Sequence, residues 1–96
     1  MRYANMEWST EATRRRRQRH IDEETALVVV ERGEVIEDSH RPGREFPTRI
    51  YCDYVDGRPL HVVVAYDDDD AFGKIVTLYE PSMDRWEPGF RVRRRQ

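Results

Sequence analysis

The stretch from Arg49 to Tyr66 decides the fold, and it reads RIYCDYV-DG-RPLHVVVAY. Two runs rich in β-branched and aromatic residues flank the dipeptide Asp56-Gly57. Such a dipeptide between two such runs predicts a two-residue type I′ turn, in which both turn residues take positive φ. We therefore expect a hairpin of two antiparallel strands.

The turn also fixes which residues face one another across this hairpin. The expected pairs are Val55–Arg58, Asp53–Leu60, Cys52–His61, Tyr51–Val62, Ile50–Val63 and Arg49–Val64. One face of the ribbon is more uniformly apolar than the other and holds Ile50, Cys52, Tyr54, His61, Val63 and Ala65. We expect the helices of the fold to pack on this more apolar face.

A first helix is expected over residues 11–19, because the hydroxyl of Ser9 or Thr10 can cap its N-terminus. This helix is polar on almost all sides, since Ala12 is its single aliphatic residue. A helix of this kind rarely packs by itself, so some arginine is expected to lie against the sheet or a second helix.

A second helix is expected between the N-cap Asp22 and Gly33, because glycine can end a helix with a positive φ. The valine run 28–30 also fits a strand, so that interpretation competes with the helix. Shorter strands are expected at 34–38 and 74–80, and the segment 1–8 is expected to be an edge strand or a frayed arm. The predicted fold class is α+β, with two N-terminal helices packed on a three- to four-stranded antiparallel sheet.

Length and composition predict one domain over residues 1–96, with no room for a second core. No segment approaches the roughly 20 apolar residues that span a bilayer, and residues 1–10 lack an apolar signal core. The single cysteine, Cys52, excludes an internal disulfide. These features favour a cytoplasmic protein that does not enter a membrane.

Charge is distributed unevenly along the chain. Residues 1–20 carry six Arg against two acids, residues 90–96 carry four Arg and no acid, and residues 21–89 carry 17 acids against seven Lys or Arg. This asymmetry predicts basic ends that seek phosphate or an acidic protein partner, or that are simply solvated.

The first helix carries the main candidate site. Glu11, Arg15 and Arg19 recur at i, i+4 and i+8 and therefore share one face. Arg15 and Arg19 could hold a phosphate backbone, because guanidinium forks match phosphate oxygens. The alternative is that Glu11 and Arg15 form an ordinary helix-stabilising pair.

Three further residues are candidates for chemistry. His61 lies in an apolar strand and could be a general acid or base, or a buried core residue. Tyr79 and Trp86 could stack on a base or close the edge of the core. His61 and Cys52 alone make no metal site, and the acidic run 67–70 lacks the pattern of a calcium loop, so no metal or cofactor is expected.

Four stretches together resemble the family called domain of unknown function 4258. They are residues 11–21 (EATRRRRQRHI), 33–37 (GEVIE), 57–64 (GRPLHVVV) and 75–81 (IVTLYEP), followed by Trp86. The likeness covers residues 8–91 and leaves 92–96 as a basic tail. In the first stretch this chain has Glu11 where the family usually has His, and His20 where the family usually has Gly. A residue other than Gly at position 20 is strained if its φ is positive.

The resemblance implies a fold and function similar to RelE-like and BrnT-like toxins, which are small mRNA endonucleases paired with an antitoxin. It implies catalytic roles for Glu11, His61 and Tyr79, and RNA or phosphate contacts for Arg15, Arg19 and Trp86. Glu11 can take a proton but cannot donate one while ionised.

Two functions are therefore expected as alternatives. The first is a toxin-like domain that binds RNA, or cleaves it without a metal, and meets an antitoxin. The second is a non-catalytic module that binds another protein or a second copy of itself.

Overall fold

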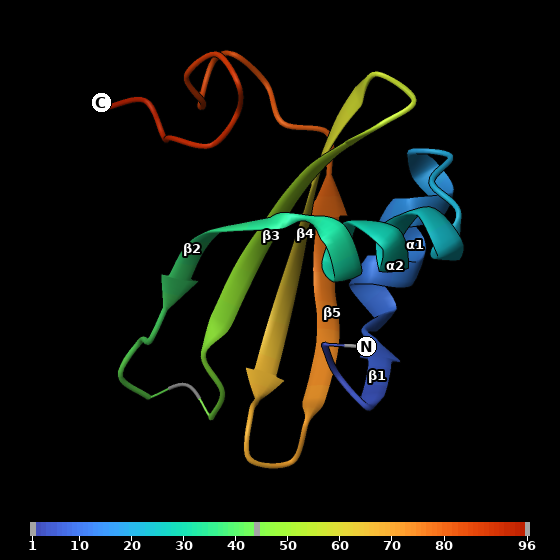
Figure 1. The fold of residues 1–96 in the computed structure, drawn as a ribbon, viewed down its shortest axis with the longest axis vertical. Helices are drawn as coiled ribbons and strands as arrows, with labels where there is room; N and C mark the ends of the chain where they lie inside the picture. Colours follow the sequence, from blue (N-terminus) through green and yellow to red (C-terminus); the bar gives the residue numbers. More distant parts are fainter. Residues whose placement is uncertain (1, 44, 96) are drawn as a thin grey trace.

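A computed structural model describes residues 2–43 and 45–95. Within them the chain forms two helices and a five-stranded sheet (Figure 1). The elements are β1 (Asn5–Trp8), α1 (Thr10–Gln18), α2 (Glu23–Arg32), β2 (Glu34–Ser39), β3 (Thr48–Val55), β4 (Arg58–Asp67) and β5 (Phe72–Tyr79). The α+β class is confirmed. No helix in the described part of the chain is long and apolar enough to cross a membrane.

The central hairpin of β3 and β4 forms as predicted. Asp56 and Gly57 both have positive φ, at 53° and 76°, as a type I′ turn requires. The register places Val55 opposite Arg58 and Cys52 opposite His61, and every other predicted pair is also observed.

The prediction of three to four antiparallel strands was wrong, because the sheet is mixed. Its order is β1-β5-β4-β3-β2, and β1 pairs with β5 in parallel. The first pairs are Asn5 with Phe72 and Met6 with Gly73, which join residues far apart in the sequence. Nothing local marks such a pairing, whereas the hairpin carries its own turn signal.

The helices pack on the opposite face from the one predicted. Val29 and Val30 of α2 share the buried core with Tyr51, Val62 and Val64, and Figure 1 shows α2 in front of the sheet. The prediction failed because it counted charged residues as exposed without regard to their place along the strand.

Arg49 illustrates this error, because it lies near the start of β3 and at the edge of the core. Its guanidinium lies 3.6 Å from the ring centroid of Tyr66 and bonds to Asp68 at 2.9 Å. The charge therefore does not interrupt the apolar centre of the helix-covered face.

The other face of the sheet is called the open face below. By register it carries Glu37 and Ser39 of β2, Thr48, Ile50 and Cys52 of β3, His61 and Val63 of β4, and Thr77 and Tyr79 of β5. No helix of the described chain packs on its centre. It is bounded by α1 on one side and by the chain after β5 on the other.

α1 begins where the β1–β5 ladder ends. The backbone N–H of Ser9 donates to Ile75 O, and the Ser9 hydroxyl donates to Val76 O at 2.7 Å while accepting from Ala12 N–H at 3.0 Å. Of the two predicted N-cap residues, Ser9 is thus the one that caps α1, and it also attaches α1 to β5. The helix then runs beside the second half of β5.

The end of α2 differs from the prediction in its geometry. Gly33 follows the helix as expected, but its φ is −70° and not positive. Glycine is needed because a Cβ here would lie 2.3 Å from Val29 O and 3.0 Å from Cys52 O. The close approach of residue 33 to the last turn of α2 and to β3, not a left-handed turn, selects glycine here.

The chain after β5, residues 81–95, is called the C-terminal segment. It covers one end of the open face, and its arginines are paired with β2: Arg91 with Glu34 and Arg93 with Glu37. Of the residues expected to be a basic tail, Arg93 is therefore held against the sheet, and Arg94 bonds to Glu87 within the C-terminal segment. Gln96 lies outside the described residues.

Candidate functional site

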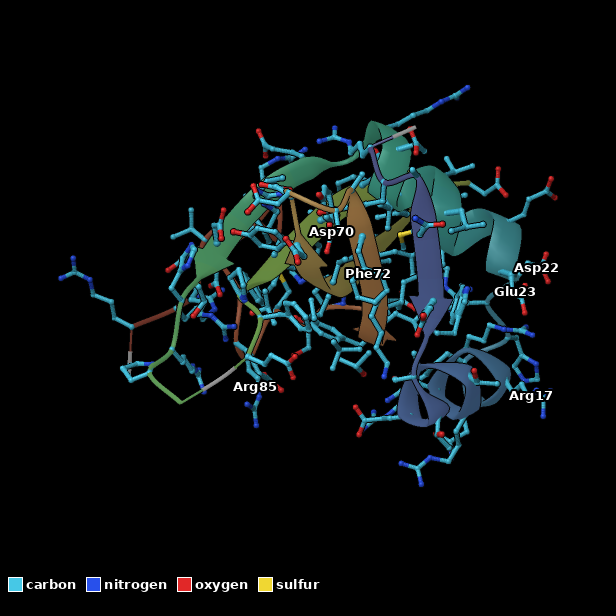
Figure 2. The ribbon with its side chains drawn as sticks, turned by 90° about the horizontal axis from the view of Figure 1, so that it is seen from below. Arg17, Asp22, Glu23, Asp70, Phe72 and Arg85 are labelled. Atoms are coloured by element: carbon cyan, nitrogen blue, oxygen red, sulfur yellow. The ribbon has the colours of Figure 1, made fainter. Side chains whose placement is uncertain are left out.

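A cavity of about 600 Å³ lies between α1, β5 and the C-terminal segment. It is called the α1 cavity, and it is lined by Glu11, Arg15, Arg19, Thr77, Tyr79, Arg85, Trp86 and Arg93. Figure 2 shows the labelled Arg85 on the side of the sheet opposite α2. The cavity thus belongs to the open face.

Two faces of α1 contact different parts of the molecule. Glu11, Arg15 and Arg19 face the α1 cavity, while Ala12 is fully buried in the core. Arg16 follows Ala12 by one turn; its guanidinium lies 5.8 Å from the Trp8 ring centroid and bonds to Glu23 of α2 at 3.2 Å. Arg16 is therefore an arginine that packs this polar helix onto the fold, which leaves Arg15 and Arg19 for the cavity.

The cavity is rich in uncompensated positive charge. Among the described residues Arg15, Arg19 and Arg85 form no ion pair. Glu11 lies 4.0 Å from Arg14 and does not pair with Arg15, so the alternative of a Glu11–Arg15 pair is not observed. Unpaired guanidinium groups gathered in a concavity attract anions.

The aromatic residues of the cavity differ in what they can offer a ligand. Tyr79 is half-buried and forms part of the wall. Trp86 is 2% exposed; its ring contacts His61 at a centroid distance of 4.5 Å, and the Arg93 guanidinium lies 4.7 Å from its centre. Tyr79 is therefore available for stacking, whereas Trp86 supports the wall.

His61 lies behind this wall and does not line the cavity. It is fully buried, and both ring nitrogens have partners. Because the carbonyl oxygen of Phe90 can only accept, Nε2–H of His61 donates to it at 2.7 Å, and Nδ1 accepts from the Tyr79 hydroxyl at 3.2 Å. His61 cannot reach a ligand in the cavity, but it orients Tyr79.

Burial sets the protonation state of this pair. Desolvation lowers the pKa of His61, although its hydrogen bond to Phe90 O opposes the shift. Burial also raises the pKa of Tyr79, against the attraction of Arg93. The neutral imidazole and the neutral phenol are therefore the resting forms at pH 7.

Five of the six candidate residues come together in one cavity, and His61 stands directly behind them. The sequence reasoning missed Thr77, Arg85 and Arg93 as wall residues. Thr77 could have been found, because it alternates with Tyr79 along β5. Arg85 and Arg93 carried no such signal, since the path of the C-terminal segment depends on contacts with distant residues.

Metal-ligating side chains do not cluster within the described ranges, where no three His, Cys, Asp or Glu are grouped so as to hold an ion. Cys52 is buried, and its thiol lies 3.8 Å from Phe90 O. In the acidic loop, Asp68 bonds to Arg49 and thus has a structural partner.

One family model matches the chain, over residues 8–80, and it is described as Domain of unknown function (DUF4258). No curated protein and no solved structure matches. The matched span includes the α1 wall of the cavity and Tyr79, but it stops before Trp86 and Arg93.

Proposed function

We propose that this chain, which belongs to the DUF4258 family of unknown function, is a toxin-like domain that binds single-stranded RNA in the α1 cavity and cleaves it without a metal ion. One observation carries the proposal. Arg15 and Arg19, which have no ion-pair partner among the described residues, share a cavity with Glu11 and the half-buried Tyr79.

Each part of this wall suits a different part of a nucleotide. A guanidinium offers two parallel N–H groups to the oxygens of a phosphate. The Tyr79 ring offers a surface on which a base can stack, and stacking of this kind contributes about 1–3 kcal/mol per base. Single-stranded RNA presents both groups side by side, because its bases are not held in a duplex.

The proposed cleavage uses the 2′-hydroxyl of the RNA as the nucleophile. The Glu11 carboxylate takes the proton from this hydroxyl as its oxygen attacks the adjacent phosphorus. Arg15 and Arg19 stabilise the negative charge that builds up on the phosphate oxygens. The 5′-oxygen leaves with a proton from water, which yields a 2′,3′-cyclic phosphate and a free 5′-hydroxyl.

His61 has a positioning role in this proposal. It holds the Tyr79 hydroxyl through Nδ1 and supports Trp86 through ring contact. Because it is fully buried, it does not exchange protons with the RNA.

The test is cleavage of a generic single-stranded RNA in the presence of EDTA. The wild type is compared with Arg15→Ala/Arg19→Ala and with the control Arg32→Ala, which removes an exposed arginine from α2. The proposal expects cleavage by the wild type and the control and none by the double variant. The same three proteins are assayed on translating ribosomes, because toxin-like nucleases can require them.

The alternative, a non-catalytic protein-interaction module, is favoured by the burial of His61, because this candidate histidine cannot exchange protons with a ligand in the α1 cavity. Binding of RNA without turnover in either assay would restrict the function to RNA binding. Absence of both binding and cleavage would favour the interaction module.

A further inference from the structure

A second cavity, of about 260 Å³, lies on the open face between β2, β3 and β4. It is called the β2 cavity, and it is lined by Glu37, Ser39, Arg41, Thr48, Ile50 and Val63. Tyr79 and Arg93 complete its wall, and both also line the α1 cavity. The two cavities are therefore neighbours that share a ridge of two side chains.

The strand register explains why these side chains converge. Ser39 pairs with Thr48 and Ile50 pairs with Val63, so all four lie on the open face. The register of β2 shifts between Val35 and Glu37, and this bulge turns Glu37 toward the same face.

The lining of the β2 cavity combines two aliphatic side chains with several polar ones. Ile50 and Val63 supply the aliphatic part. Ser39 and Thr48 supply hydroxyls, and neither hydroxyl bonds to another described residue, so both can donate and accept. A base can use both kinds of contact, because its ring face packs on apolar side chains while its edge forms hydrogen bonds.

The two cavities differ in their net charge. In the β2 cavity Arg93 is neutralised by Glu37, so Arg41 is the one arginine there that forms no ion pair within the described ranges. The α1 cavity has three such arginines. The α1 cavity therefore favours a phosphate, and the β2 cavity favours an uncharged base.

We infer that the β2 cavity is a base-binding subsite for the nucleotide next to the one whose phosphate lies on Arg15 and Arg19. The strand crosses the ridge of Tyr79 and Arg93, its base lies on Val63, and Arg41 contacts the following phosphate. The ligand is thus an extended single strand of at least two nucleotides. This inference rests on the proposed RNA binding. It adds that the second nucleotide of the strand, bound in the β2 cavity, strengthens the binding.

The test measures binding to RNA that cannot be cleaved, because 2′-O-methylation blocks the nucleophile. A fluorescent 2′-O-methyl tetrauridylate is displaced by unlabelled tetrauridylate or by unlabelled 2′-O-methyluridine 5′-monophosphate. The wild type is expected to bind the tetranucleotide at least tenfold more tightly than the mononucleotide.

Two variants remove the subsite in different ways. Val63→Phe fills the β2 cavity and is expected to weaken tetranucleotide binding about tenfold while leaving mononucleotide binding unchanged. Arg41→Ala, a change at an exposed loop residue, is expected to weaken tetranucleotide binding about fivefold. It should also lower the dependence of log K on log salt concentration by about 0.7, as for one lost phosphate contact. Arg32→Ala is the control for both variants.

The outcomes separate this inference from the proposed function. If Arg15→Ala/Arg19→Ala abolishes binding but Val63→Phe and Arg41→Ala both bind the tetranucleotide as the wild type does, the subsite is disproved and the RNA site stands. If the wild type binds neither probe, both are overturned.

Discussion

Nδ1 of His61 lies 3.2 Å from the hydroxyl oxygen of Tyr79, the residue opposite it in the β4–β5 ladder. On the other side of the imidazole ring, Nε2 lies 2.7 Å from Phe90 O. One buried side chain thus connects the sheet, the cavity wall and the C-terminal segment. Both hydrogen bonds are satisfied at once by a neutral ring.

This arrangement predicts that the folded state loses stability as pH falls below about 6.5. The pKa of His61 is lower in the folded protein than its ordinary value, so the unfolded chain binds the proton first. The stabilising contribution is complete above the unfolded pKa and is lost as pH falls toward the folded one. Urea unfolding between pH 7.5 and pH 5 measures the slope.

The matched variants for this slope are His61→Gln and His20→Asn. His61→Gln should flatten the dependence on pH and cost about 1–3 kcal/mol, because a buried partner of Tyr79 or Phe90 is lost. His20→Asn removes an exposed histidine and should keep the slope. An equal slope in wild type and His61→Gln would show that His61 does not titrate between the two states.

Glu11 is predicted to act as the general base. Glu11→Gln keeps the shape of the side chain but cannot take a proton, so RNA cleavage should fall by about 10²–10⁴-fold with RNA binding retained. Glu7→Gln, an exposed residue of β1, is the control. Cleavage at the wild-type rate by Glu11→Gln would exclude this carboxylate as the base.

Gly33→Ala is predicted to destabilise the protein by about 1–3 kcal/mol or more, because the new Cβ would lie 2.3 Å from Val29 O. The φ of −70° suits alanine, so the cost is purely one of space. Thermal unfolding of this variant tests the close approach of Gly33 to the last turn of α2 and to β3. A stability equal to that of the wild type would mean that this junction has room for a methyl group.

His20 provides the opposite case, since its φ is 55° and the strain lies in the backbone. His20→Gly and His20→Ala both remove an exposed side chain, but only glycine takes this φ without strain. His20→Gly should therefore be about 1 kcal/mol more stable than His20→Ala. Chemical denaturation of the pair measures this difference, and equal stabilities would contradict a strained turn between the helices.

Local signals explain what could be predicted from the sequence. The turn Asp56-Gly57 determined the hairpin and its register, and the spacing of Glu11, Arg15 and Arg19 determined which side chains of α1 share a cavity. These features depend on residues that are close together in the chain.

The remaining features depend on residues that are far apart. The parallel pairing of β1 with β5, the pair Arg93–Glu37 and the bond from His61 to Phe90 O join distant segments. The helix-covered face was also missed, because the position of Arg49 at the edge of the core follows from its contacts with Asp68 and Tyr66. Periodicity reports which residues share a face but not which face is covered.

The two helix N-caps provide a last test, because they look alike in sequence and differ in structure. The Ser9 hydroxyl accepts from Ala12 N–H at 3.0 Å and donates to Val76 O at 2.7 Å. Asp22 occupies the N-cap of α2 but makes no side-chain capping bond.

Ser9→Ala should therefore cost about 0.5–2 kcal/mol, and Asp22→Ala should cost less. Urea unfolding of both variants measures the two losses of stability. A larger loss of stability for Asp22→Ala would contradict the finding that Ser9, and not Asp22, makes the side-chain capping bond. Since Ser9 also attaches α1 to β5, Ser9→Ala should weaken RNA binding, because the cavity needs Arg15 held opposite Tyr79. Asp22→Ala should leave RNA binding unchanged, because α2 does not line the α1 cavity.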